Sequence, residues 1–189
     1  MTKNNIWTFW IIIGLTISCN SNNDKTFEKS LQTDPSQEVT HKFKNVSFTL
    51  SNKFKKQYKH SNSDMIMFSD DSFKIFGVKS IKLQSDQMNM DLSSLTTSEL
   101  NEYGKMITNE NRKEFTDITY ISATHTEIGG IKAIRILQNS KSVSGNNKNI
   151  NIALYCVLAD PYYHSIRIGS QIQELSKFEE TIRNNISIQ

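Results

Sequence analysis

Residues 149–158, NINIALYCVL, decide the fold class of this chain, because apolar residues recur at every second position along them. This period of two is typical of a β-strand. Successive side chains of a strand point to opposite faces, and we expect the face with the more uniform apolar character to lie in the core. That face holds Ile150, Ile152, Leu154, Cys156 and Leu158, and the opposite face holds Asn149, Asn151, Ala153, Tyr155 and Val157.

The segments on both sides of this strand also have strand patterns. Residues 117–127 and 131–139 flank Gly129-Gly130. Two glycines between strand-like runs predict a hairpin, because the turn needs positive φ angles. After the central strand, Asp160-Pro161 turns the chain into another strand, residues 162–169. Connections this short predict antiparallel neighbours.

Strand patterns begin earlier, at Val46, Phe48 and Leu50, which alternate with polar residues. Two further runs, residues 65–68 and 73–81, are separated by the turn-prone sequence SDDS. We interpret these two runs as a second hairpin.

A helix is predicted from Thr96, which has the spacing of a capping box with Glu99. The apolar residues that follow share one helical face. They are Leu100, Tyr103, Met106 and Ile107. Gly104 lies inside this helix and costs about 1 kcal/mol relative to alanine, so the helix should need tertiary packing.

A second helix is predicted at the C-terminal end, where Ser170 and Gln173 again have capping-box spacing. Glu179 and Arg183 are expected to form an i,i+4 ion pair on its exposed side. Its apolar face comprises Ile172, Leu175, Phe178 and Ile182. We expect this helix to lie on the sheet.

This order of elements predicts an α+β domain with a mostly antiparallel sheet and two helices packed on it. Four features have the layout of a known superfamily: the opening strand Phe48-Thr49-Leu50, the Gly129-Gly130 hairpin followed by Ala133, the Tyr162-Tyr163 strand, and the final helix around Phe178. With this layout, residues 46–186 resemble the PsbP-like α/β/α sandwich. That superfamily includes photosystem accessory proteins, a nuclear-import factor that binds the GTPase Ran, and many small bacterial lipoproteins. The resemblance implies mainly a fold, because the members share no common active site. It suggests accessory or binding roles rather than catalysis.

The amino-terminal segment has the pattern of an export signal. Residues 6–17, IWTFWIIIGLTI, form an apolar run after Lys3. A helix of this length spans about 18 Å, which is too short for a hydrocarbon core of about 30 Å. We therefore interpret the run as the apolar part of a signal peptide.

The tetrad Thr16-Ile17-Ser18-Cys19 resembles the lipobox of bacterial lipoproteins, although leucine is commonest where this chain has Thr16. In that family the cysteine thiol receives a diacylglyceryl group, and cleavage exposes its amine, which is usually acylated too. The resemblance implies cleavage before Cys19 and a membrane anchor of two or three acyl chains, enough for stable retention. The alternative is an ordinary secretory signal with an incidental cysteine.

We therefore divide the chain into a signal peptide (1–18), a lipidated cysteine with a flexible tether (19–42) and one α+β domain (43–189). The tether is polar and has almost no large apolar residues, so it cannot offset the entropy cost of ordering. The expected location is the bacterial cell envelope outside the cytoplasm. Asn20, in place of aspartate, favours the outer over the inner membrane.

Charge and cysteine content exclude some function classes. The chain has 22 basic and 19 acidic residues, and removal of the signal peptide takes away only Lys3. This balance argues against nucleic-acid binding, which needs a dense basic surface. Once Cys19 carries lipid, Cys156 has no partner for an internal disulfide.

No residue set in the sequence identifies a reaction, a metal site or a cofactor. His41, His60, His125 and His164 are scattered without metal-ligand spacing, and we expect His164 to be half-buried or at a sheet edge and His125 to be solvated. Cys156 lies on an apolar strand face, where a thiol is inert. The adjacent carboxylates Asp70-Asp71 and Glu179-Glu180 are expected to be solvated surface groups.

The most concentrated charge lies in residues 53–60, KFKKQYKH. Its candidate contact face consists of Lys53, Phe54, Lys55, Lys56, Tyr58 and Lys59. This face could meet an envelope protein or an anionic envelope component. The alternative is an exposed segment whose lysines deter edge-to-edge strand pairing.

We interpret the domain as a non-catalytic binding or accessory module, tethered to a membrane through lipid on Cys19. Two alternatives stay open: an envelope enzyme with a site in a groove between helix and sheet, and a purely structural envelope protein.

Overall fold

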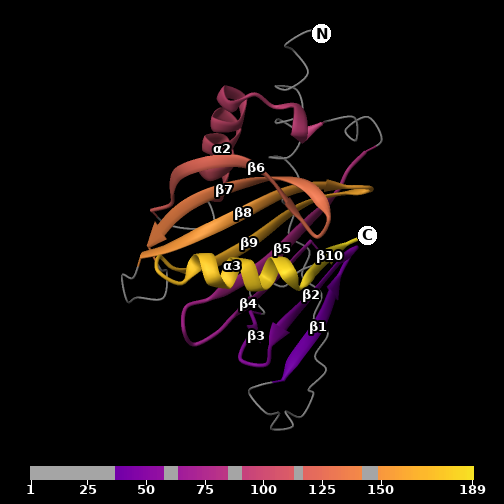
Figure 1. Ribbon diagram of the computed structural model, residues 1–189, viewed down its shortest axis with the longest axis vertical. Helices are drawn as coiled ribbons and strands as arrows, with labels where there is room; N and C mark the ends of the chain where they lie inside the picture. Colours follow the sequence, from indigo (N-terminus) through magenta and orange to yellow (C-terminus); the bar gives the residue numbers. More distant parts are fainter. Residues whose placement is uncertain (1–36, 58–63, 85–90, 113–116, 142–148) are drawn as a thin grey trace. The chain divides into compact units, whose positions relative to one another are not determined.

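A seven-stranded antiparallel sheet forms the centre of the computed structural model, which describes residues 37–57, 64–84, 91–112, 117–141 and 149–189 (Figure 1). The strand order is β3-β4-β5-β9-β8-β7-β6, and every neighbouring pair is antiparallel, as predicted. The strands are β3 (Lys55–Lys56), β4 (Met65–Ser69), β5 (Ile75–Lys82), β6 (Thr119–Ile128), β7 (Ile131–Lys141), β8 (Asn149–Ala159) and β9 (Tyr162–Gln171). Both predicted hairpins, β4–β5 and β6–β7, are confirmed.

A second, three-stranded sheet contains β1 (Glu38–Phe43), β2 (Val46–Ser51) and β10 (Ile186–Ile188), in the order β1-β2-β10. Strand β1 occupies residues that we assigned to the tether, so the folded domain begins before residue 43. The reason is tertiary, because β1 pairs with β2 and its His41 ring packs on Phe48 and Phe68. The sequence pattern did not predict β10, which is only three residues long.

The β6–β7 turn needs its two glycines. Gly129 and Gly130 have φ angles of +59° and +81°, in the left-handed region that disfavours other residues. A Cβ atom on Gly129 would also lie 2.9 Å from a side-chain carbon of Ile188. The turn therefore brings the hairpin close to β10.

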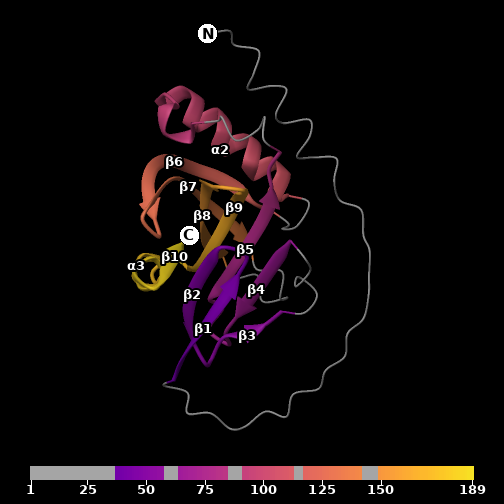
Figure 2. The ribbon, with the colours of Figure 1, turned by 90° about the vertical axis from the view of Figure 1, so that its right-hand side faces the viewer.

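Helix α2 (Thr97–Asn111) follows a short 3₁₀ helix, η2 (Leu92–Ser94), and starts as predicted. The backbone N–H of Glu99 donates to the Thr96 hydroxyl at 3.4 Å, and the Thr96 N–H donates to the Glu99 carboxylate at 2.8 Å. Gly104 allows close packing, because a Cβ there would lie 2.4 Å from a ring carbon of Tyr120. The helix packs mainly on β6 (Figure 2).

Helix α3 (Leu175–Asn184) starts later than we predicted. Ser170 belongs to β9, which continues in register with β8 up to Gln171, so the expected capping box does not form. Glu174 precedes the helix and makes no side-chain cap hydrogen bond, and Ile172 is 57% exposed instead of packed. The helix packs on β9, β8 and β2.

Strand β8 is buried on both faces, so our assignment of one core face was incomplete. Ile152, Leu154 and Cys156 are buried as predicted, but Ala153, Tyr155 and Val157 are fully buried as well. This second face belongs to the main core with residues of the small sheet and α3. The opposite face of the large sheet meets α2, where the Tyr163 hydroxyl lies 3.0 Å from that of Tyr103. The domain is thus an α+β sandwich with one helix on each face of the sheet.

Candidate functional site

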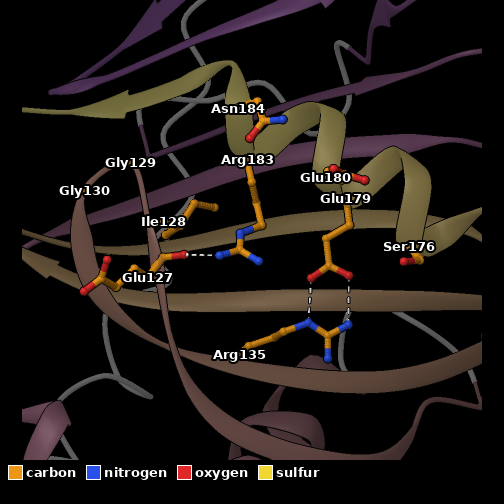
Figure 3. Close-up of a pocket in the computed structure, with 10 residues that line it drawn as sticks. All are labelled: Glu127, Ile128, Gly129, Gly130, Arg135, Ser176, Glu179, Glu180, Arg183 and Asn184. Atoms are coloured by element: carbon orange, nitrogen blue, oxygen red, sulfur yellow. Dashed lines mark hydrogen bonds and ion pairs between the residues drawn. The ribbon is translucent and has the colours of Figure 1, made fainter.

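An open pocket of about 620 Å³ lies between α3 and the β6–β7 hairpin (Figure 3). The hairpin and β7 supply one wall and the floor, and α3 supplies the other wall. The lining residues are Glu127, Ile128, Gly129, Gly130, Arg135, Ser176, Glu179, Glu180, Arg183 and Asn184. Charged groups of both signs dominate this lining.

The floor of the pocket holds an ion pair between β7 and α3. Arg135 donates through Nε to Oε1 of Glu179 at 2.5 Å and through Nη2 to Oε2 at 2.8 Å. The hydroxyl of Tyr155, on the adjacent strand β8, donates to the same carboxylate. Glu179 is therefore buried, and our prediction of an exposed Glu179–Arg183 pair was wrong. Arg183 instead donates to the backbone oxygen of Glu127 at 3.0 Å.

The electrostatics of this cluster hold Glu179 as a carboxylate. Burial alone would raise its pKa, but the hydrogen bonds from Arg135 and Tyr155, with the charges of Arg135 and Arg183, keep the pKa below its usual value. Burial and the adjacent Glu179 raise the pKa of Tyr155, so its hydroxyl stays protonated and donates. Both oxygens of Glu179 accept hydrogen bonds within the domain, which suits a structural role better than proton transfer.

The rim of the pocket remains available for contact. Glu127 is exposed on β6, and Glu180 is exposed on α3. The side chain of Arg183 extends from α3 toward β6 (Figure 3). The arrangement offers a polar surface of mixed charge around the Arg135–Glu179 ion pair. Such a surface can bind a complementary polar group by hydrogen bonds and ion pairs.

The structure describes residues 53–57 of the lysine-rich segment that we proposed as a contact face. Lys55 and Lys56 form β3, an exposed strand of two residues at one end of the strand order, and Lys53 is exposed just before it. Phe54 is partly buried, and its ring stacks on Phe178 of α3 with centroids 5.6 Å apart. Tyr58, Lys59 and His60 lie outside the described residues.

Cys156 is fully buried, in agreement with our interpretation of its strand face, and is a free cysteine. Burial raises the pKa of its thiol, which disfavours the reactive thiolate. Its environment includes the hydroxyls of Tyr103 and Tyr163 under α2. This cluster is closed to solvent.

The histidines that the structure describes, His41, His125 and His164, are not among the residues that line the pocket. His125 is exposed, with Nε2 2.9 Å from the backbone oxygen of Leu95, and His41 packs on two phenylalanines. His164 is fully buried in the central strand β9, so the expectation of a half-buried or edge histidine was wrong. Among the described residues no three acidic, histidine or cysteine side chains form a cluster that could hold a metal ion.

The ion pair on the pocket floor was missed by the sequence reasoning. Glu179 and Arg135 are 44 residues apart, and the helical spacing of Glu179 and Arg183 gave a misleading local partner. One signal was available: Arg135 is flanked on both sides by apolar residues in the run AIRIL, residues 133–137. A charge in such a strand needs a partner.

The sequence matches no protein-family model and no curated protein. The structure is similar to that of CyanoP, the cyanobacterial PsbP of Synechocystis sp. PCC 6803, with 11% identity and a TM-score of 0.57 over 86% of this chain and 98% of the other. This likeness shows a shared PsbP-like fold.

Other solved structures share a weaker likeness. A crystal structure from Bacteroides thetaiotaomicron has 8% identity and a TM-score of 0.48, over 82% of this chain and 49% of the other. The Ran-binding protein Mog1p of Saccharomyces cerevisiae has 7% identity and a TM-score of 0.48, over 81% of this chain and 96% of the other. No helix among the described residues is long and apolar enough to cross a membrane.

Proposed function

We propose that this chain is a bacterial envelope lipoprotein whose domain is a non-catalytic binding or accessory module. The observation that carries the proposal is the cysteine at position 19, which follows a short apolar run and a lipobox-like tetrad. An anchor at this site would hold the domain outside the cytoplasm, on the outer membrane in preference to the inner membrane.

The non-catalytic role is supported by the surroundings of two groups that could take part in a reaction, a carboxylate and a thiol. The Glu179 carboxylate is bound by Arg135 and Tyr155, and the Cys156 thiol is buried. Each of these groups contributes to packing, and a catalytic acid, base or nucleophile must instead be open to its substrate.

The anchor is tested by labelling cells with a fatty-acid probe. We expect label on the wild-type protein and none on Cys19→Ala, because the thiol is the attachment point. A matched control is Cys156→Ala, which should keep the label because that thiol is buried in the folded domain. Equal labelling of wild type and Cys19→Ala would overturn the proposal.

The binding role is tested by site-specific crosslinking in membranes. We propose that the pocket rim meets an envelope protein, so a photo-crosslinker at Glu180 should capture a defined neighbour. The same group at Glu102, an exposed position on α2, serves as the control. Identical captured species at both positions, or none at Glu180, would count against a binding role for the pocket.

A further inference from the structure

His164 occupies an unusual place for a histidine. It lies on β9, between β5 and β8 in the large sheet, and its side chain is fully buried. Because side chains alternate along a strand, His164 shares a face with Ile166 and Ile168. Those two residues belong to the main core, which also contains Val46 and Phe48 of the small sheet. The imidazole therefore lies on the face of the large sheet against which the small sheet packs.

The hydrogen bonds of the ring suit the neutral form. Nδ1 lies 2.8 Å from the hydroxyl of Ser80 on β5, which can donate or accept as the tautomer requires. Nε2 is buried and has no hydrogen-bond partner among the described residues. A protonated ring carries two N–H donors and a positive charge, so one donor would be buried without an acceptor. An unpaired buried charge is among the costliest changes in a protein core.

The charged groups around His164 do not offset that cost. Lys44, in the β1–β2 turn, lies 6.0 Å from the ring of Tyr162, whose own centroid is 5.7 Å from that of His164. Asp64 is exposed and meets Ser80 through its backbone oxygen. The titratable groups on the two strands paired with β9 are Lys79 and Lys82 on β5 and Tyr155 and Cys156 on β8. On α3, the carboxylate of Glu179 is already bound by Arg135, and Lys177, Glu180 and Arg183 are exposed.

We propose that His164 makes the stability of the domain sensitive to acid. The core is stable while the ring is neutral, and the folded state is destabilised when the ring gains a proton. A domain outside the cytoplasm is exposed to the pH of its surroundings, so the biological role of this acid response rests on the proposed location. The acid response itself does not depend on the anchor. The unfolding experiment below tests the acid response, and the fatty-acid labelling tests the anchor, so the two proposals can fail independently.

The direction of the pH response follows from burial, which lowers the pKa of His164 from 6.5 to about 4. The unfolded chain therefore takes up this proton before the folded one does. Stability is complete above the unfolded value and falls as the pH decreases from about 6.5 to about 4. Below that range both states are protonated and this contribution stays constant.

The test compares urea unfolding of the full chain at pH 7.5 and pH 4.5. The unfolding equilibrium constant of the wild type should rise roughly fifty- to a hundredfold more than that of His164→Gln, which keeps a hydrogen-bonding side chain but cannot be protonated. His125→Gln, which replaces an exposed histidine, should respond to pH as the wild type does. Equal pH responses of wild type and His164→Gln would overturn the proposal.

A second measurement covers the case in which His164→Gln does not fold. The ring resonances of His164 in the folded wild type are followed by NMR as the pH is lowered. Retention of the neutral ring below pH 5 is the expected result. Protonation of the ring near pH 6.5 without loss of folded signals would show that the core tolerates the charge, and would overturn the proposal.

Discussion

The two helices of this domain, α2 and α3, are stabilised by different kinds of interaction. Helix α2 begins at a capping box, in which Thr96 and Glu99 satisfy each other's backbone donors. Helix α3 begins after Glu174 without a side-chain cap, and is held by its buried apolar face and by Glu179, which binds Arg135. The contrast teaches that local hydrogen bonds position one helix, whereas contacts between distant residues position the other.

The largest expected effect is on α3. Glu179→Ala leaves Arg135 without its carboxylate partner and should lower the free energy of unfolding by about 3 kcal/mol. This value is at the lower end of the range for a buried ion pair, because the Arg135 side chain is 24% exposed. Urea unfolding measures the loss. The adjacent exposed residue supplies the control, since Glu180→Ala should change stability by less than about 0.5 kcal/mol. Equal losses in the two variants would show that the ion pair does not hold α3.

The next effect tests the packing of α2. Gly104→Ala should lower the free energy of unfolding by about 1–2 kcal/mol, because the new Cβ would meet the Tyr120 ring, which is held by a hydrogen bond to Asn101. Helix propensity alone predicts the opposite sign, a gain of about 1 kcal/mol. Thermal unfolding distinguishes the two. Asn109→Ala, at an exposed site on the same helix, should be neutral or stabilising, and a gain for Gly104→Ala would contradict the close packing.

A smaller effect is expected at the start of α2. Thr96→Ala removes the side-chain acceptor for the Glu99 N–H and should cost about 1 kcal/mol in the free energy of unfolding. Chemical denaturation at neutral pH is sufficient to measure it. Thr96→Ser keeps the acceptor and should retain most of the stability. If alanine and serine behave alike, the capping box does not contribute.

The smallest effect is expected at Gln173, which has capping-box spacing from Ser170 but precedes α3. Gln173→Ala should change the free energy of unfolding by less than about 0.5 kcal/mol, since the residue is exposed and outside the helix. A loss similar to that of Thr96→Ala would mean that α3 starts earlier in solution.

The elements that could be predicted from the sequence are those with local causes. The Gly129-Gly130 turn needs positive φ angles, and the alternation in β2 and β8 marks strands. The candidate site could not be predicted in the same way. Arg135, Glu179 and Tyr155 come from three elements, and only the pairing of β7 with β8 and the docking of α3 bring them together.

The amino-acid sequence by itself determined the α+β class, the antiparallel hairpins and the start of α2, because each depends on residues within a few positions of one another. Tertiary structure alone decided the burial of both faces of β8, the pairing of β10 with β2, and the burial of Glu179 and His164. The physical reason is that burial depends on which layer covers a face. A period of two identifies a strand but does not show whether one or both of its faces will be covered.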